Sequence, residues 1–273
     1  MKAFEIGSKK TVLFYLHGLR GHGLAQKAAL ERFKKSLGVC IVSLELPGHG
    51  ADSAKEHCMV PEYRQLVELI CDEVKRRASD SDQVVLMGYS FGGALTALAT
   101  KALEDDDEFA PDVAAYIGLS AAFDVGHNVP AWQLALAGAI APLSRFLFRH
   151  APRWSRYITI REMDVSLISP DLTVQQSILD DDLLYKGRIP LNTSAQVYKT
   201  SIAAKKAINL IDAPVMLIHS RDDAIALAPT KETFKPSVTL KLFDNLRHNC
   251  IDGVSREVVK SRKAIAQFIV EKL

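Results

Sequence analysis

The sequence has no long apolar run, no excess of charge of either sign and no targeting pattern at its start. No segment reaches the roughly 18 apolar residues needed to span a bilayer, and the first ten residues are too polar for a signal peptide. The 34 Lys and Arg residues nearly balance the 32 Asp and Glu residues, leaving a formal net charge of +2. That balance argues against a nucleic-acid partner bound mainly through phosphates. These absences predict a cytoplasmic protein.

The cysteines also lack a pattern. Cys40, Cys58, Cys71 and Cys250 are scattered, with no CxxC pair. Neither a zinc site nor a disulfide framework is therefore indicated, and buried thiols in a reducing compartment are expected. The glycine-rich loops match neither GxxxxGK[ST] nor GxGxxG, so a phosphate cradle is not indicated. We expect no metal and no organic cofactor.

Six short apolar runs do have the pattern of buried strands. Each is free of polar alternation and bounded by turn residues, which is typical of a parallel sheet covered on both faces. The expected strands are Val12–His17, Val39–Leu44, Val84–Gly88, Val113–Leu119, Pro214–His219 and Val238–Phe243.

Stretches with helical periodicity lie between these runs, which predicts an α/β fold with a mostly parallel sheet flanked by helices. The expected helices are Leu24–Leu37, Pro61–Ala78 with Pro61 as its first residue, Phe91–Leu103 and Val254–Leu273. No convincing strand falls between Asp124 and Ala204. We therefore expect a core formed by residues 1–124 and 205–273 and a helical cap formed by residues 125–204.

The most informative segment is Gly88-Tyr89-Ser90-Phe91-Gly92. GxSxG alone is a weak signal, but here an apolar strand leads into it and a helical pattern leads out. That context places a serine on a strained turn with its hydroxyl exposed, as a nucleophile requires. The alternative is that Ser90 is only the N-cap of the helix.

A serine nucleophile needs a base, and the base needs an acid to fix its tautomer. In this strand–turn–helix arrangement the chain order is serine, acid, histidine. Among the eight histidines, only His248 lies beyond the last expected strand, in a loop before the final helix. His219 precedes the acid candidates at the end of a strand and is expected to be a buried turn residue.

Three aspartates could serve as the acid. Asp222 and Asp223 are adjacent in the loop after Pro214–His219, and Asp124 follows the preceding strand. Neighbouring residues alone do not choose among them.

The first strand ends in a glycine-rich turn that begins at His17-Gly18-Leu19. Such a turn lets backbone N–H groups point at a developing oxyanion. The N–H groups of Leu19 and Phe91 are the natural pair, and the alternative is an ordinary glycine loop.

Together these segments resemble the α/β-hydrolase superfamily, and in particular its lid-bearing esterases. The resemblance rests on His17-Gly18, Leu46–Ser53, Gly88–Gly93, Pro214–Asp223 and Arg247-His248-Asn249, in that order along the chain. It implies an α/β-hydrolase fold, with Asp223 as the catalytic acid. Ser220 stands where the family has a glycine and Glu45 where an aspartate is common. Only about ten residues precede the first clear strand, so we expect the antiparallel strands that usually open the family's sheet to be mostly missing.

A weaker likeness points to the monoacylglycerol lipase and lysophospholipase group. It rests on Ile168–Asp171 and Asp182–Arg188, which are similar to the segment leading out of that group's cap. The resemblance implies a serine hydrolase that cleaves carboxylic esters through Ser90, His248 and Asp223, acting on a small-molecule acyl ester. Thioester or amide hydrolysis, acyl transfer on the same triad, and a non-catalytic binding protein of this fold are the alternatives.

The expected cap contains an apolar segment, Val129–Ala141, followed by Arg145, Arg149 and Arg156 among aromatic residues. A helix apolar on all sides is usually buried, and a solvated helix face explains the arginines. The functional hypothesis is that the cap holds an acyl chain and makes transient contact with an anionic lipid surface. On that hypothesis medium or long acyl chains are preferred over acetyl.

Overall fold

The computed structural model describes residues 2–6, 11–52, 57–125, 159–160 and 163–273. The apolar segment Val129–Ala141 and the arginines from Arg145 to Arg156 lie outside these described residues. In chain order, the elements are β1 Lys2–Ile6, β2 Thr11–Leu16, α1 Lys27–Leu37, β3 Cys40–Glu45, η1 Gly50–Asp52, α2 Tyr63–Ala78, β4 Gln83–Tyr89, α3 Phe91–Glu104, β5 Asp112–Leu119, β6 Thr159–Ile160, η3 Val165–Leu167, α5 Leu172–Asp180, β7 Ile189–Pro190, α6 Leu191–Ala207, β8 Val215–Ser220, η4 Lys231–Thr233, β9 Thr239–Phe243 and α7 Arg256–Lys272.

The main sheet has seven strands in the order β1-β3-β2-β4-β5-β8-β9. All six expected strands are present, with ends shifted by at most one residue, and neighbours among them pair in parallel. The exception is β1, which lies at the sheet edge and pairs antiparallel with β3, Lys2 opposite Glu45. One antiparallel strand of the family's usual opening is therefore present, where the sequence suggested that these strands are mostly missing.

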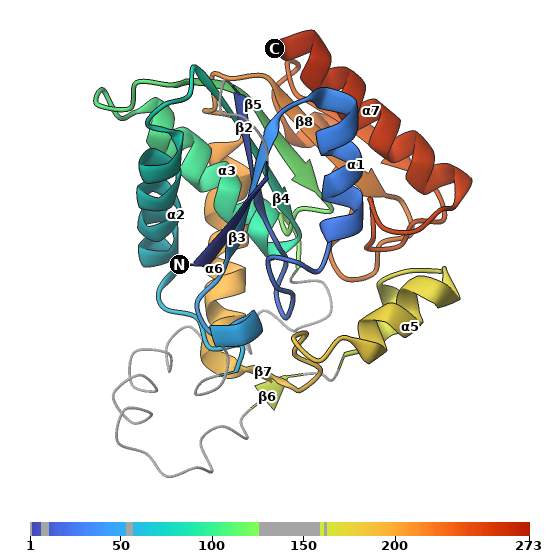
Figure 1. Ribbon diagram of the computed structural model, residues 1–273. Coiled ribbons are helices and arrows are strands. Elements are labelled where there is room, and N and C mark those ends of the chain that lie inside the picture. The colour runs from blue at the N-terminus through green and yellow to red at the C-terminus, as the bar shows by residue number, and fades with distance from the viewer. Residues whose placement is uncertain (1, 7–10, 53–56, 126–158, 161–162) are drawn as a thin grey trace, which may run out of the picture.

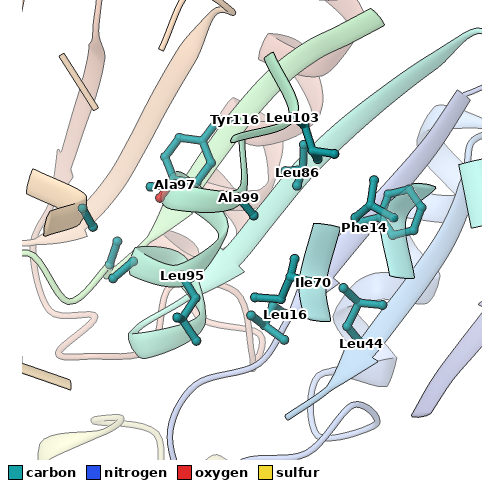
Figure 2. Close-up of a cluster of buried hydrophobic side chains, with 14 of the residues drawn as sticks. Phe14, Leu16, Leu44, Ile70, Leu86, Leu95, Ala97, Ala99, Leu103 and Tyr116 are labelled. Atoms are coloured by element: carbon teal, nitrogen blue, oxygen red, sulfur yellow. The ribbon is translucent and has the colours of Figure 1, made fainter. Parts of the chain in front are cut away.

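Helices cover both faces of this sheet, with α2, α3 and α6 on one side and α1 and α7 on the other (Figure 1). Strand β2 shows why its sequence lacks alternation. Val12, Phe14 and Leu16 pack into the core under α2 and α3, whereas Leu13 and Tyr15 pack into the core under α1 and α7. Figure 2 shows the first of these cores, in which side chains of β2, β3 and β4 meet those of α2 and α3.

The predicted start of the second helix was wrong by two residues. Helix α2 begins at Tyr63, and Glu62 is its N-cap, accepting a hydrogen bond from the N–H of Arg64 at 3.0 Å. Pro61 precedes the cap rather than opening the helix. A capping carboxylate satisfies an N–H group that has no partner inside the helix.

The described part of the expected cap contains more than helix. Strands β6 and β7 form a short antiparallel pair, whereas the sequence indicated no strand in this region. Helix α6 continues across residue 204, the expected boundary, and packs against α3 and α2. Among the described residues, no helix combines the length and apolar character needed to cross a bilayer. All four cysteines lie in the described part of the chain and are buried as thiols.

Candidate active site

The candidate residues follow four parallel strands, each just beyond its carboxyl end. Leu19 follows β2, Ser90 follows β4, Asp223 follows β8 and His248 follows β9. In open α/β sheets this edge is where ligands bind. The topology alone therefore brings residues separated by up to 229 positions to one edge of the sheet.

Ser90 occupies the sharp turn between β4 and α3 with a φ of 55° and a ψ of −120°. A positive φ in a residue other than glycine costs of order 1–3 kcal/mol and persists only where neighbours enforce it. The enforcing contacts are backbone hydrogen bonds: the Ser90 N–H donates to Leu119 at 2.9 Å, and its carbonyl accepts from Ala122 at 3.0 Å. Ser90 does occupy the N-cap position of α3, but its side chain makes no capping hydrogen bond, so capping does not account for the serine side chain.

Two glycines allow this turn because there is no room for a side chain. A Cβ on Gly88 would lie 2.5 Å from the carbonyl oxygen of Gly92, and a Cβ on Gly92 would lie 2.5 Å from the carbonyl oxygen of Leu16. Helix α3 therefore begins in direct backbone contact with the end of β2. Gly93 is next to the sheet as well, since its Cβ would lie 2.9 Å from the carbonyl oxygen of Gly88 in β4.

His248 joins the serine to the acid. Its Nε2 lies 2.8 Å from Ser90 Oγ, and its Nδ1 lies 2.7 Å from Asp223 Oδ2. An ionised carboxylate only accepts hydrogen bonds, so Nδ1 carries the proton and Nε2 is left to accept from the serine hydroxyl. This is the tautomer that a general base for Ser90 requires.

Asp223 is 3% exposed, and its carboxylate is fully engaged. Oδ1 accepts from the N–H groups of Ile225 at 2.9 Å and Ala226 at 3.0 Å. Burial alone would raise the pKa of Asp223, but the imidazole of His248 and hydrogen bonds from His219 and His248 together lower it below its ordinary value. The acid is therefore held as a carboxylate.

The other two acid candidates lie elsewhere. Asp222 accepts from the Ser220 hydroxyl and from the Arg247 N–H at 3.4 Å. The Asp124 side chain is exposed, and its backbone carbonyl accepts from Leu227. Of the three aspartates, only Asp223 has its carboxylate at His248.

The turn after β2 and the start of α3 flank the serine. A Cβ on Gly18 would lie 3.1 Å from Ser90 Cβ, so this turn touches the residue directly. Within the described ranges, the N–H groups of Leu19 and Phe91 donate no hydrogen bond. Phe91 is the first residue of α3, where N–H groups lack helical partners and carry a partial positive charge.

His17 holds this turn in place. Its Nε2 accepts from the Leu46 N–H at 3.1 Å, so its Nδ1 carries the proton and donates to the Gly18 carbonyl at 2.7 Å. Burial lowers the pKa of His17 well below its ordinary value, and the ring stays neutral. The histidine of His17-Gly18 therefore braces the turn against the end of β3.

The structure also shows partners of the site that the sequence did not indicate. The segment from Asp164 to Pro170 packs on the histidine loop: the N–H of His248 donates to Leu167 at 3.4 Å, and that of Asn249 donates to Ile168 at 2.8 Å. The Arg247 guanidinium donates to carbonyls of the same segment, at Ser166 and Ser169. We define this segment, residues 164–170, as the clamp. The likeness at Ile168–Asp171 was its one sequence signal.

A second contact joins the turn after β2 to residues 181–185. Nε2 of His22 lies 2.7 Å from Asp181 Oδ2, and the Tyr185 N–H donates to the Arg20 carbonyl at 2.9 Å. Nothing in the sequence around His22 indicated this pair. In the part of the chain that the structure describes, no group of three or more His, Cys, Asp or Glu side chains is placed to hold a metal ion.

Comparison with known proteins places this chain in a family. The model of a family described as serine aminopeptidase, S33, matches residues 7–252. An uncharacterised abhydrolase domain-containing protein of Dictyostelium discoideum is 23% identical over 251 residues, which cover 89% of this chain. The chain spans only 24% of that relative's length.

Two solved structures share the fold over nearly the whole chain. One is a monoacylglycerol lipase of Paleococcus ferrophilus, with a TM-score of 0.79 and 19% identity, covering 100% of this chain and 99% of that one. The other is a soluble variant of monoglyceride lipase from Saccharomyces cerevisiae, with a TM-score of 0.76 and 14% identity, covering 99% of this chain and 90% of that one. At these identities the likeness establishes the fold, which is the α/β-hydrolase fold.

Proposed function

This chain belongs to the serine aminopeptidase S33 family, and from that premise we propose that it is a serine hydrolase that cleaves carboxylic esters. The observation that carries the proposal is the continuous hydrogen-bonded series Ser90 Oγ, His248, Asp223 Oδ2, with separations of 2.8 and 2.7 Å. Those distances are within the range in which a base can take the proton of a nucleophile.

In the first half of the reaction Ser90 Oγ attacks the acyl carbonyl while His248 Nε2 takes the hydroxyl proton. The carbonyl oxygen becomes an oxyanion, and the N–H groups of Leu19 and Phe91 donate to it. His248 then gives the proton to the leaving alcohol as the tetrahedral intermediate collapses. The product of this half is an acyl ester on Ser90.

In the second half water attacks the acyl group, and His248 Nε2 takes a proton from that water. The acid leaves, and the proton returns to Ser90 Oγ. During both halves His248 is transiently an imidazolium ion, and the charge of Asp223 stabilises it at 2.7 Å. The lowered pKa of Asp223 supports this role, because the carboxylate remains ionised while the imidazole changes its charge.

The proposed substrates are medium- or long-chain acyl esters such as monoacylglycerol or lysophospholipid. The two lipases whose fold this chain shares support a glycerolipid ester. The apolar sequence of Val129–Ala141 supports a long acyl chain, and we keep residues 125–204 as the proposed cap. Transient lipid contact through that cap and a cytoplasmic location stay predictions.

One observation favours a second candidate, amide hydrolysis. The family is described as serine aminopeptidase, and the same three side chains can attack an amide carbonyl. Ester and amide hydrolysis differ in the leaving group to which His248 must give its proton.

The test uses acetyl and decanoyl esters of one chromogenic phenol, with the decanoyl thioester and anilide beside them. We expect the decanoyl ester to be cleaved with the highest kcat/KM and Ser90→Ala to be inactive on all four. Intact-mass detection of a fluorophosphonate adduct, absent in Ser90→Ala, reports the nucleophile independently of the substrate. A Ser90→Ala variant that keeps more than about a tenth of the turnover refutes the nucleophile. Equal kcat/KM for acetyl and decanoyl esters refutes the long-chain preference, and a preferred anilide favours the peptidase.

A further inference from the structure

His219, the next-to-last residue of β8, contacts the carboxylate of Asp223 through its imidazole ring. Its Nε2 lies 3.2 Å from Asp223 Oδ2 and 2.8 Å from the carbonyl oxygen of Ala226. The His219 side chain is 1% exposed and that of Asp223 is 0% exposed. The same carboxylate oxygen, Oδ2, receives the Nδ1–H of His248.

The proton on His219 can be assigned from these partners. The Ala226 carbonyl accepts and never donates, so a 2.8 Å contact requires a proton on His219 Nε2. That N–H then also faces Asp223 Oδ2 and donates to it as the longer branch of a shared hydrogen bond. His219 is thus a donor to the acid, besides holding the loop through Ala226.

With this contact the Asp223 carboxylate has four donors. Oδ1 has the N–H groups of Ile225 and Ala226, and Oδ2 has His248 and His219. Four is about the number of hydrogen bonds that a carboxylate can accept. Two donors on each oxygen fix the rotation of the carboxylate, and burial leaves no solvent to replace a donor that is removed.

We propose that His219 is a positioning residue, which donates to Oδ2 of Asp223 and holds that carboxylate in the orientation that receives the Nδ1–H of His248. The proposal rests on the proposed function of Ser90, His248 and Asp223. Its action reaches the serine through Asp223 and then His248, and His219 itself touches no reacting atom. Because each donor contributes a fraction of the acid's effect, we expect a loss smaller than that from changing Asp223 itself.

The experiment compares His219→Leu, which removes the donor, with His219→Gln, whose amide N–H keeps one. The rate of fluorophosphonate labelling of Ser90 and kcat on the decanoyl ester are both measured. We expect roughly 10- to 100-fold lower values for His219→Leu with KM unchanged, and recovery to within about threefold for His219→Gln. The matched control is Thr200→Val in helix α6, which removes another buried hydrogen bond, from the Thr200 hydroxyl to the Gln196 carbonyl at 2.7 Å, outside the hydrogen bonds of the triad. It should lower the melting temperature and leave kcat of the folded fraction unchanged.

A double-mutant cycle separates positioning through Asp223 from a general effect on the fold. In an Asp223→Asn background, His219→Leu should cost no further activity, because the acid through which it acts is gone. A full additional loss in that background, or His219→Leu with wild-type labelling and kcat, overturns the proposal. The downfield proton resonance of His248 Nδ1–H gives a readout without a substrate, and it should shift in His219→Leu and stay in place in Thr200→Val. If wild type labels at Ser90 yet cleaves no ester, the proposed function fails while the labelling rates still test His219.

Discussion

Replacing Gly92 by alanine tests the close contact on which the site depends. The added Cβ would lie 2.5 Å from the carbonyl oxygen of Leu16 and closer still to that of His17, both backbone atoms at the end of β2. Real Cβ atoms essentially never come within 3.0 Å of such neighbours, and the nearer contact, with His17, is only 2.2 Å, so the start of α3 has to move from β2 by about 0.8 Å.

The displacement has two expected consequences. Forcing a methyl group into a packed interior costs about 1–3 kcal/mol in the free energy of unfolding. The second consequence concerns activity, because Gly92 follows Phe91 at the start of α3 and contacts the end of β2, from which the turn carrying Leu19 begins. Separating those two N–H groups misplaces the proposed oxyanion donors, and misplacements near 1 Å cost about 100-fold in rate.

The assay measures kcat on the decanoyl ester and the unfolding free energy in urea, with Gly38→Ala as the control. Gly38 has a φ of 67° and nothing within 4 Å of its missing Cβ, so alanine there is strained without a clash. That strain costs roughly 1–2 kcal/mol, which matches the stability loss of Gly92→Ala. We expect a large fall in kcat for Gly92→Ala alone. Wild-type kcat in a folded Gly92→Ala protein would refute the reasoning about the oxyanion donors.

Three further predictions follow from single side chains. Asp223→Asn should lower kcat by roughly 10⁴-fold, as the loss of the acid does in other triads. Asp222→Asn should lower kcat only mildly in the same steady-state assay. Equal large losses would contradict the assignment of Asp223 as the acid. Burial raises the pKa of Asp252 to about 6, so the folded state binds its proton more tightly than the unfolded chain and loses stability as pH rises from about 4 to about 6. Asp252→Asn should therefore raise the urea midpoint of unfolding at pH 8 but not at pH 4. A gain at both pH values would exclude titration of Asp252 as its cause. Thr193→Val should destabilise the fold by about 1–3 kcal/mol, since this buried hydroxyl donates to the Cys58 carbonyl and accepts from the Val60 N–H. Thermal denaturation measures the loss of stability, and an unchanged melting temperature would refute the prediction.

The strands of the core and the geometry around Ser90 could be predicted because each has a strong local cause. A run such as Val84–Gly88 is apolar on both faces, and a strand between two helical layers buries both. The glycines of the serine turn follow from close backbone approach, which any side chain blocks. His248 could be chosen because only one histidine follows the last expected strand.

The choice of Asp223 as the acid could not be made from local sequence patterns. Two adjacent aspartates follow β8, and the direction of each side chain depends on loop turns that no local pattern specifies. Asp222 faces the Arg247 N–H and Asp223 faces His248. The family resemblance indicated Asp223, whereas the physics of the neighbouring residues did not.

Two of the contacts missing from the sequence prediction join segments far apart in the chain, and a third is local. His22 meets Asp181 across 159 positions, and the clamp meets the histidine loop across about 80. His219 was expected to be a buried turn residue, and its contact with Asp223 depends on how the loop after β8 folds back. Each of these pairs involves ordinary polar residues whose significance arises only when the chain brings them together.

The strand order has a consequence for how the protein is made. Everything that shapes the serine turn lies between β2 and Ala122, so this part of the sheet can assemble while the chain is still being synthesised. The proposed acid, Asp223, and base, His248, follow β8 and β9, and β8 pairs Ile218 beside Leu119, about 100 residues later in the chain. A nascent chain would therefore carry the Ser90 turn before the proposed base and acid are in place. Until β8 docks, β5 is an apolar open edge, the kind of edge that recruits other strands and leads to aggregation. We therefore expect truncated chains that end before Val215 to be prone to aggregation and to be removed by chaperones and proteases.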